Sequence, residues 1–234
     1  MIPPRIVLAR PGIGENIGFV VRLLANFELD ELVLADPAAG FERGAARTAS
    51  MCPERLARVR VVGDAASALL DTSHVFGFSA RGGRERELLP LAELGALASG
   101  IPRGARVAFL FGNEESGLTS EETGYCHRLL TIPLPGLGSL NLSHAVALVL
   151  YEYFRAGQAA APDSRHRFAS TGEKQRLAEQ ARATLGTWAF AVDDPHFEGS
   201  VRRLLFGNPI QARDTRILHR ILRHLDYVRN HGSN

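Results

Sequence analysis

The chain lacks several features that would assign it to a common class. No apolar run reaches the roughly 18 residues needed to cross a bilayer, so the sequence predicts no membrane partner. The first ten residues lack the basic, then apolar, then small-residue order of a secretory signal. The only cysteines, Cys52 and Cys126, form neither a CxxC pair nor a spaced framework. These absences predict no metal site, no disulfide scaffold and a cytoplasmic protein with reduced thiols.

What is present suffices for a sizeable core. Of the 234 residues, 45% are hydrophobic and 22% are charged, which is an ordinary globular balance. This length fits one large domain, or a domain with a smaller appendage.

Charge is weak overall and uneven along the chain. The formal net charge is +2 and the sequence pI is about 8.8, so charge alone does not indicate nucleic acid. Residues 165–234, however, include 12 Lys plus Arg but only 7 Asp plus Glu. Lys174 is the only lysine, which the base composition of a genome can explain. A guanidinium also suits phosphates, so this tail is a candidate for RNA contact.

The first 155 residues alternate short apolar runs with helix-compatible segments, which predicts an α/β fold with a mainly parallel sheet. Near-continuous Val, Ile, Leu and Phe runs indicate strands buried on both faces. The predicted strands are 5–9, 31–35, 58–62, 74–79, 106–111 and 128–133, and the predicted helices are 17–27, 65–70, 91–98 and 142–154. Sites in such sheets collect outside the carboxyl ends of the strands. The loops after Ala9, Ser79, Phe111 and Pro133 are therefore expected side by side.

A change of composition then divides the chain. Residues 157–170 carry many small and polar side chains without a period, as a linker does. Beyond them, helices are predicted at 173–185, 199–205 and 214–229, the last with Ile217, Ile221, Leu222 and Leu225 on one stripe. The predicted organisation is a domain at 1–156, a linker at 157–170 and a small all-α extension at 171–234.

The first informative stretch is G-I-G-E-N-I-G-F-V-V-R-L-L-A-N-F, residues 12–27. It runs from a strand into a helix, yet it lacks the GxGxxG spacing and the P-loop lysine, which disfavours a dinucleotide or NTP site. Asn16 and Arg22 lie about 9 Å apart along that helix. Arginine among apolar neighbours needs a partner, and an ion pair with Asp36 or Glu114 is the structural alternative to a functional role.

The second stretch is V-A-F-L-F-G-N-E-E-S-G-L-T, residues 107–119. Its glycines let the main chain approach a ligand closely. Glu114 and Glu115 are adjacent rather than placed across a cleft, which disfavours glycosidase chemistry. A plain strand-to-helix turn capped by Thr119 is the structural alternative.

The third stretch is I-P-L-P-G-L-G-S-L-N-L-S-H, residues 132–144. Prolines and glycines make it a shaped loop that leads into a helix N-terminus, where free amides and the helix dipole face a ligand. Ser139 or Asn141 can cap that helix, and one cap suffices. The surplus polar groups are therefore expected to face a ligand and an RNA, although His144 can also be an ordinary helix-start residue.

Together the three stretches resemble the SpoU/TrmH family of RNA 2′-O-methyltransferases, within the SPOUT class. The matching motifs are N-I-G-x-x-x-R-x-x-x-N-F (16–27), F-G-N-E-x-x-G-L (111–118) and I-P-x-x-G-x-x-S-L-N-L-S (132–143). The tail at 202–225 and the G-F-S-A-R segment at 77–81 are similar to the TrmJ branch, which methylates tRNA ribose 32 in the anticodon loop. Phe78 departs from the threonine usual in that branch.

This resemblance implies a trefoil knot in the carboxyl-terminal part of the sheet, a homodimer, a tRNA substrate and S-adenosylmethionine as cofactor. The residues implied around the reacting ribose are Asn16, Arg22, Glu114, Ser139 and Asn141. The implied cofactor contacts, mainly through the main chain, are Phe78, Ser79, Ala80, Gly112, Asn113, Ile132, Gly138, Ser139 and Leu140.

Arg22 is the residue that the resemblance nominates for catalysis. A ribose 2′-hydroxyl is a poor nucleophile, so a group must take its proton or stabilise its developing charge. Arginine is a reluctant base, which favours Arg22 as a charge stabiliser, held with a phosphate oxygen by Asn141 and Ser139. The alternatives are an rRNA 2′-O-methyltransferase, a non-catalytic RNA-binding protein of the same fold and a small-molecule enzyme that uses a nucleotide.

Overall fold

A single sheet of parallel strands forms the centre of the molecule, in the order β3-β2-β1-β6-β4-β7-β5. The computed structural model describes residues 2–80, 87–136, 138–156, 167–188, 192 and 195–231. The strands are β1 (Arg5–Ala9), β2 (Leu32–Ala35), β3 (Arg60–Val62), β4 (His74–Phe78), β5 (Leu88–Pro90), β6 (Val107–Phe111) and β7 (Arg128–Thr131). The predicted α/β class with a mainly parallel sheet is confirmed.

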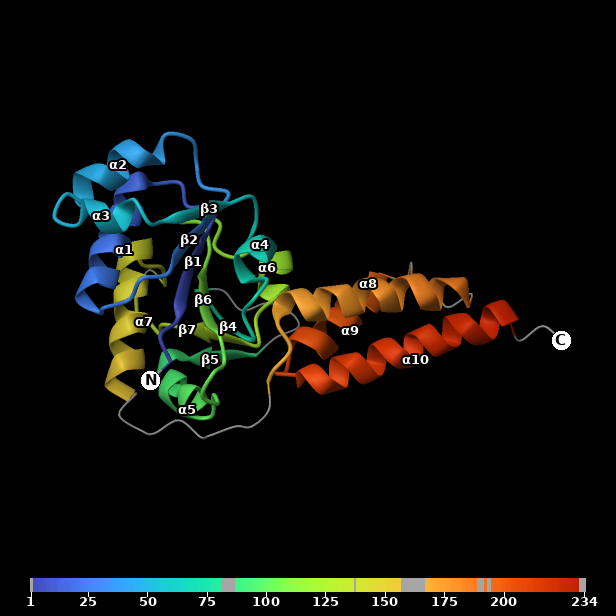
Figure 1. Ribbon diagram of the computed structural model, residues 1–234. Helices are drawn as coiled ribbons and strands as arrows, with labels where there is room; N and C mark the ends of the chain where they lie inside the picture. The colour runs from blue at the N-terminus through green and yellow to red at the C-terminus, as the bar shows by residue number, and fades with distance from the viewer. Residues whose placement is uncertain are drawn as a thin grey trace.

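Helices cover both faces of this sheet (Figure 1). They are α1 (Gly14–Asn26), α2 (Phe41–Thr48), α3 (Pro53–Leu56), α4 (Ala65–Leu69), the 3₁₀ turn η1 (Leu91–Glu93), α5 (Leu94–Ser99), α6 (Ser120–Gly124), α7 (Leu142–Ala156), α8 (Thr171–Thr187), α9 (Pro195–Phe206) and α10 (Ala212–His231). No helix in these described ranges is long and apolar enough to cross a membrane.

Two hydrophobic clusters lie on opposite faces of the sheet, because successive side chains of a strand point to opposite sides. In β1, Ile6 and Leu8 belong to the cluster under α1 and α7, whereas Val7 and Ala9 belong to the cluster under α4. All five residues of β1, β4 and β6 are buried. Burial on both faces is the physical reason for their unbroken apolar sequences.

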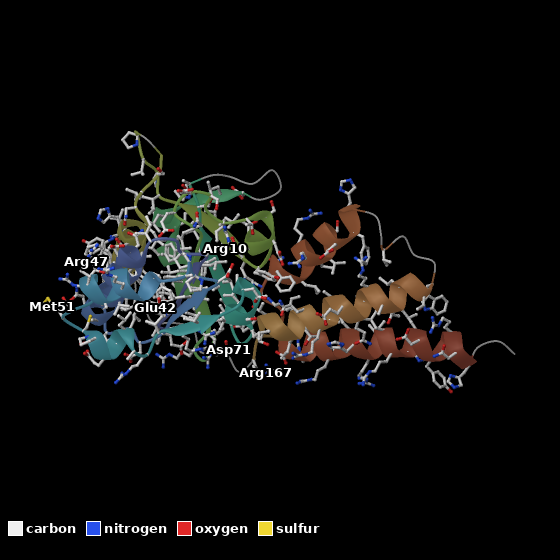
Figure 2. All side chains as sticks on the ribbon, turned by 90° about the horizontal axis from the view of Figure 1, so that it is seen from above. Arg10, Glu42, Arg47, Met51, Asp71 and Arg167 are labelled. Carbon is white, nitrogen blue, oxygen red and sulfur yellow. The ribbon has the colours of Figure 1, made fainter. Side chains whose placement is uncertain are left out.

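The helical extension completes the second of these clusters. Leu177 of α8, Phe206 of α9 and Leu222 of α10 pack with the sheet residues of that face. The start of α8 is also bonded to the turn after α4, because the Thr171 amide donates to the Thr72 carbonyl at 2.7 Å. From this junction α8 and α10 extend side by side away from the sheet (Figures 1 and 2).

The predicted stripe on α10 is only partly the packed face. Leu222 is buried and Leu225 is partly buried, but Ile217 and Ile221 are exposed. The packed face contains Thr215 and Leu222, which are buried, whereas Ile217 and Ile221 lie on an exposed face. Helix α10 therefore presents apolar side chains on two sides. Of the predicted linker, only residues 167–170 lie in the described chain, and there Phe168 forms a bridge with Gln211.

The strand order brings the predicted loops together. β1, β6, β4 and β7 are consecutive in the sheet and run in the same direction. The loops after Ala9, Phe78, Phe111 and Thr131 therefore leave the same edge, as predicted.

Several short elements were not predicted. They are the edge strand β5 and the helices α2 and α3, of which β5 has three residues and α3 has four. Segments of this length show too few periods for a pattern to be visible. The turn capped by Thr119, given as the structural alternative for the second stretch, is present: the Thr119 hydroxyl accepts the Glu122 main-chain amide at 3.1 Å at the start of α6.

Candidate functional site

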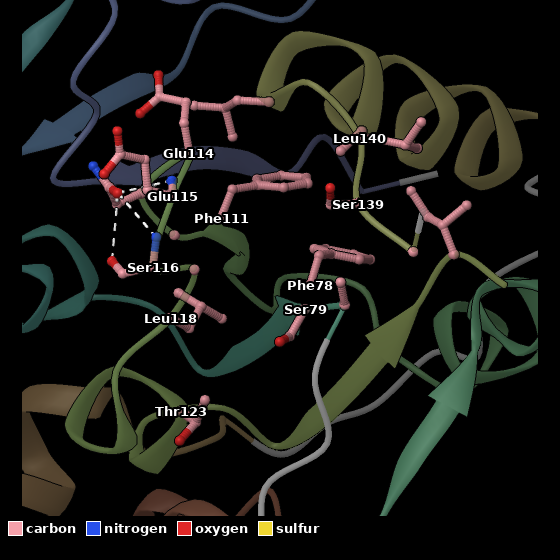
Figure 3. Close-up of a pocket in the computed structure, with 18 of the residues that line it drawn as sticks. Phe78, Ser79, Phe111, Glu114, Glu115, Ser116, Leu118, Thr123, Ser139 and Leu140 are labelled. Atoms are coloured by element: carbon pink, nitrogen blue, oxygen red, sulfur yellow. Dashed lines mark hydrogen bonds between the residues drawn. The ribbon is translucent and has the colours of Figure 1, made fainter. Parts of the chain in front are cut away.

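A cavity of about 310 Å³ opens at the carboxyl edge of β4, β6 and β7. Its wall combines the ends of these strands with the loop before α6 and the loop that leads into α7. Figure 3 shows the rings of Phe78 and Phe111 near Ser139, with Glu114, Glu115 and Ser116 grouped to one side. The size lies at the lower end of the roughly 300–1,000 Å³ typical of small-ligand pockets.

All of the residues predicted to contact a cofactor line this one cavity. They are Phe78, Ser79, Ala80, Gly112, Asn113, Ile132, Gly138, Ser139 and Leu140. They come from three loops that are distant in sequence, so their convergence is a property of the fold. Arg81, also noted in the sequence, lies outside the described residues.

The turn at Asn113–Gly117 is fixed by its own hydrogen bonds. The Asn113 carbonyl accepts the Gly117 amide at 2.9 Å, and the Asn113 side-chain oxygen accepts the Glu115 amide at 2.9 Å. A Cβ at Gly112 would lie 2.1 Å from the Gly117 carbonyl carbon. Gly117 itself has φ of +69°, a region that favours glycine. The glycines therefore allow the two ends of the turn to touch.

A chain of hydrogen bonds links the three motifs beside the cavity. Asn141 Nδ2 donates to Asn16 Oδ1 at 2.8 Å, and Asn16 Nδ2 donates to Glu114 Oε1 at 2.9 Å. At the other end, Asn141 Oδ1 accepts the Ser143 amide at 2.9 Å and its hydroxyl at 2.7 Å. Asn141 is therefore the cap of α7, and Ser143, one of the surplus polar residues noted at this helix start, also belongs to the chain.

Glu114 sits at the start of α1. Its carboxylate accepts the amides of Gly12 at 2.8 Å and Ile13 at 3.2 Å. Free amides and the positive end of a helix dipole both favour a negative charge at this place. Glu114 thereby ties the second motif to the first.

Arg22 stands apart from this group. It is exposed on α1 and does not line the cavity. Among the described residues it makes no hydrogen bond or ion pair, so the structural alternative of a pair with Asp36 or Glu114 is not observed. The expectation that Asn141 holds Arg22 is not met within one chain, because Asn141 is bonded to Asn16 and Ser143.

Charge in the cavity has one sign. The only charged side chains among its described lining residues are Glu114 and Glu115, and the rest are apolar or neutral. Such a wall favours a ligand with a cationic centre and an apolar part over a polyphosphate. No group of three His, Cys, Asp or Glu in the described chain could hold a metal ion.

Comparison with known proteins gives a consistent result. The family model described as the SpoU rRNA Methylase family matches residues 3–151. A tRNA (cytidine-2′-O-)-methyltransferase TrmJ of Sulfolobus acidocaldarius is 31% identical over 152 residues, covering 64% of this chain and 65% of that protein. A tRNA (cytidine/uridine/adenosine-2′-O-)-methyltransferase TrmJ of Pseudomonas aeruginosa is 36% identical over 174 residues, covering 71% and 67%. The match thus spans about two thirds of each relative.

The similarity extends to a solved structure over nearly the whole chain. A crystal structure of TrmJ from Z. mobilis is similar with a TM-score of 0.81 at 28% identity, and the match covers 95% of this chain and 99% of that one. The helical extension is therefore included in the comparison.

Proposed function

This chain belongs to the SpoU rRNA methylase family, and we propose that it methylates the ribose 2′-hydroxyl of a tRNA with S-adenosylmethionine. The observation that carries the proposal is that the second and third motifs line one cavity, and that the Asn16 side chain of the first motif is hydrogen-bonded to Glu114 of the second and Asn141 of the third.

The cavity fits this cofactor. S-adenosylmethionine supplies an activated methyl group on a sulfonium, and it carries an aromatic adenine ring and no phosphate. Phe78, Phe111 and Leu140 provide apolar surface, and the two lining carboxylates suit a cation. The Phe78 departure is compatible with this role, because its ring packs on Phe111 with centroids 4.8 Å apart and leaves the main chain of the strand end at the cavity.

The proposed work of the protein is alignment and charge stabilisation. A ribose hydroxyl develops negative charge as it loses its proton, and a nearby guanidinium stabilises that charge. Arg22 serves this purpose and orients the adjacent phosphate; a guanidinium is a poor proton acceptor, so the hydroxyl proton leaves to water as the methyl group moves from sulfur to oxygen. Asn16 and Asn141, fixed by their bonds, and Ser139 at the wall position the nucleotide; holding the reactants in place supplies much of the rate.

A homodimer would bring Arg22 to a cavity. Arg22 does not line the cavity of its own chain. Phe19 on α1 and Leu148 and Tyr151 on the adjoining α7 are exposed apolar side chains, and such surfaces mark interaction sites. Pairing of two chains through α1 and α7 would cover them and place each Arg22 toward the partner. The trefoil knot, like the dimer, remains a proposal from the family resemblance.

The helical extension is the proposed tRNA contact. All five arginines of α10 are exposed, and Arg216, Arg220 and Arg223 fall on one face of the helix. Within the described chain these three have no acidic partner. Unpaired guanidiniums in a row suit the phosphates of an RNA backbone. We therefore propose the organisation 1–156, 157–170 and 171–234 as catalytic domain, linker and RNA-binding extension of a cytoplasmic enzyme.

The target nucleotide is proposed to be ribose 32 of the anticodon loop, from the similarity to the TrmJ branch. The description of the matching family as rRNA methylases favours rRNA as the second candidate.

Transfer of tritium from labelled S-adenosylmethionine to total RNA of a methylase-deficient host tests the proposal. Label in the tRNA fraction, mapped by nuclease digestion and mass spectrometry to a 2′-O-methylated nucleotide 32, is expected. Label in rRNA would support the second candidate, and label on a base, or none in any RNA, would overturn the proposed reaction.

A further inference from the structure

Arg10 directly follows the last residue of β1 and lies six positions before the first motif. Its side chain contacts the second motif. Its main chain has φ of +52°, a left-handed conformation that is uncommon for residues other than glycine. Its side chain donates to both oxygens of Glu122, from Nε and from Nη2, at 2.8 Å each. Arg10 is labelled in Figure 2, within the sheet domain.

The same guanidinium also holds the Asn113–Gly117 turn. Nη2 donates to the Gly117 carbonyl at 2.9 Å, and Nη1 donates to the Ser116 hydroxyl at 3.2 Å. In return Asn113 Nδ2 donates to the main-chain carbonyl of Arg10 at 2.8 Å. Arg10 therefore touches the turn at its beginning and at its end.

Glu122 is itself firmly held. It is only 7% exposed, and its Oε2 accepts the Thr119 amide at 2.7 Å in the capping box of α6. Burial raises the pKa of this carboxyl, but the hydrogen bonds from Arg10 and Thr119 outweigh burial, and the pKa lies below its ordinary value. A buried carboxylate with a bidentate guanidinium is a geometrically specific contact, and removal of the guanidinium leaves the charge without compensation.

Ser116 and Gly117 belong to the cavity wall, whereas Arg10 and Glu122 do not. Arg10 can thus affect a ligand only through the turn that it holds. We infer that Arg10 and Glu122 are positioning residues, which hold the Asn113–Gly117 turn in the shape that binds the cofactor. This inference rests on the proposed function for the identity of the cofactor.

The test compares Arg10→Ala with wild type in two measurements. Calorimetric titration with S-adenosylmethionine, without RNA, is expected to show at least a tenfold weaker Kd for the variant. Steady-state methylation is expected to show a similar rise in the KM for the cofactor, with kcat at saturating cofactor within about threefold of wild type. A merely destabilised protein would lose active fraction and kcat instead, with KM unchanged.

Two further variants grade the effect and protect against loss of folding. Arg10→Lys keeps the charge but cannot reach Glu122, Ser116 and Gly117 together, so an intermediate Kd is expected. Glu122→Gln turns an amide toward the guanidinium and is expected to weaken cofactor binding several-fold. Arg155→Ala is the matched control, because Arg155 makes an equally bidentate contact with Glu152, at 3.0 and 2.6 Å, at the far end of α7.

Cofactor affinity of Arg10→Ala and Glu122→Gln equal to that of wild type would overturn the inference, as would loss confined to kcat. Wild type that binds no S-adenosylmethionine would overturn the proposed function and the inference together. Wild type that binds the cofactor but methylates no RNA would overturn the proposed function alone, while weak binding by the variants would still support the positioning role.

Discussion

The Nζ atom of Lys174 lies 2.8 Å from Nε2 of His127, inside the junction between the sheet and the helical extension. Lys174 is fully buried, and its other polar neighbour is the Asn208 carbonyl at 3.3 Å. His127 Nδ1 accepts the Val75 amide at 2.9 Å. A neutral His127 therefore carries its proton on Nε2 and donates it to Lys174, which must accept as an uncharged amine.

Burial lowers the pKa of Lys174 to about 7. Burial, with the nearby Lys174 charge, also holds the pKa of His127 well below its ordinary range. Both shifts agree with the hydrogen-bond pattern. The junction of the two parts of the molecule thus contains a lysine that titrates in the physiological range.

Lys174 can be observed alone, because it is the only lysine in the chain. In protein labelled with ¹³C-lysine, the single Cε resonance is expected to titrate with a midpoint near 7. Between that pH and 10.5, the unfolded chain binds a proton that the folded chain does not, so the free energy of unfolding rises with pH at about 1.4 kcal/mol per pH unit. Lys174→Met is expected to lose this slope between pH 7 and 9. A midpoint near 10.5, or parallel slopes for both proteins, would contradict the assignment.

Arg22→Ala is expected to reduce methylation by at least a thousandfold, because the charge on the ribose oxygen loses its stabiliser. Affinity for S-adenosylmethionine, measured by calorimetry, should stay within a few-fold of wild type, since Arg22 does not line the cavity. Arg43→Ala, an exposed arginine on α2, is the control and should retain activity. Loss of cofactor binding in Arg22→Ala would refute the role given to this residue.

Asn16→Ala breaks the hydrogen-bond chain at its centre. Glu114, which is partly buried, and Asn141, which is exposed, each lose a hydrogen bond, and such a bond contributes about 0.5–1.5 kcal/mol to stability. We expect a loss of unfolding free energy in that range, measured by urea denaturation, together with a lower kcat. Asn26→Ala, at the exposed end of the same helix, should change neither. An Asn16→Ala protein as stable and active as wild type would show that the chain has no such role.

Gly112→Ala is expected to open the Asn113–Gly117 turn of the second motif, which lines the cavity. The new Cβ would lie 2.1 Å from the Gly117 carbonyl carbon, which is main chain and cannot rotate away. Cofactor affinity should fall at least tenfold in calorimetry. Gly136→Ala, where a Cβ meets nothing within 4 Å, provides the comparison and should bind within about twofold of wild type. Equal affinities for the two variants would contradict the turn's role.

Replacement of Arg216, Arg220 and Arg223 by glutamine is expected to weaken tRNA binding at least tenfold. The slope of log K against log salt should fall by about 2–3, since each of the three lost phosphate contacts removes about 0.7–0.9. The matched control replaces three exposed arginines of the sheet domain, Arg43 of α2, Arg58 before β3 and Arg60 of β3, by glutamine. If both triple variants lose affinity equally, net charge and not α10 is responsible.

The sequence was sufficient for the parts of the fold that local pattern determines. Strand β1 lies where it was predicted, because five consecutive buried residues leave a continuous apolar signature. The cofactor-lining residues were predicted from the family motifs, and they converge as expected. Their assignment to a cofactor stays a prediction.

Other features could not be predicted because they depend on contacts distant in sequence. Arg10 and Glu122 are separated by 112 positions, and nothing near either residue indicates the other. Lys174 could be noticed as the only lysine, but its burial against His127 depends on how the extension packs. The outward position of Arg22 depends on which face of α1 the sheet covers.

The hydrophobic cluster that α8, α9 and α10 share with the sheet has a consequence for substrate choice. Because Leu177, Phe206 and Leu222 are part of that core, the basic helix cannot swing freely relative to the cavity. An RNA that bound both α10 and the cavity, as proposed, would have to span a fixed distance between them. Selection of a single nucleotide would then depend on the shape of the folded RNA and not on its nucleotide sequence.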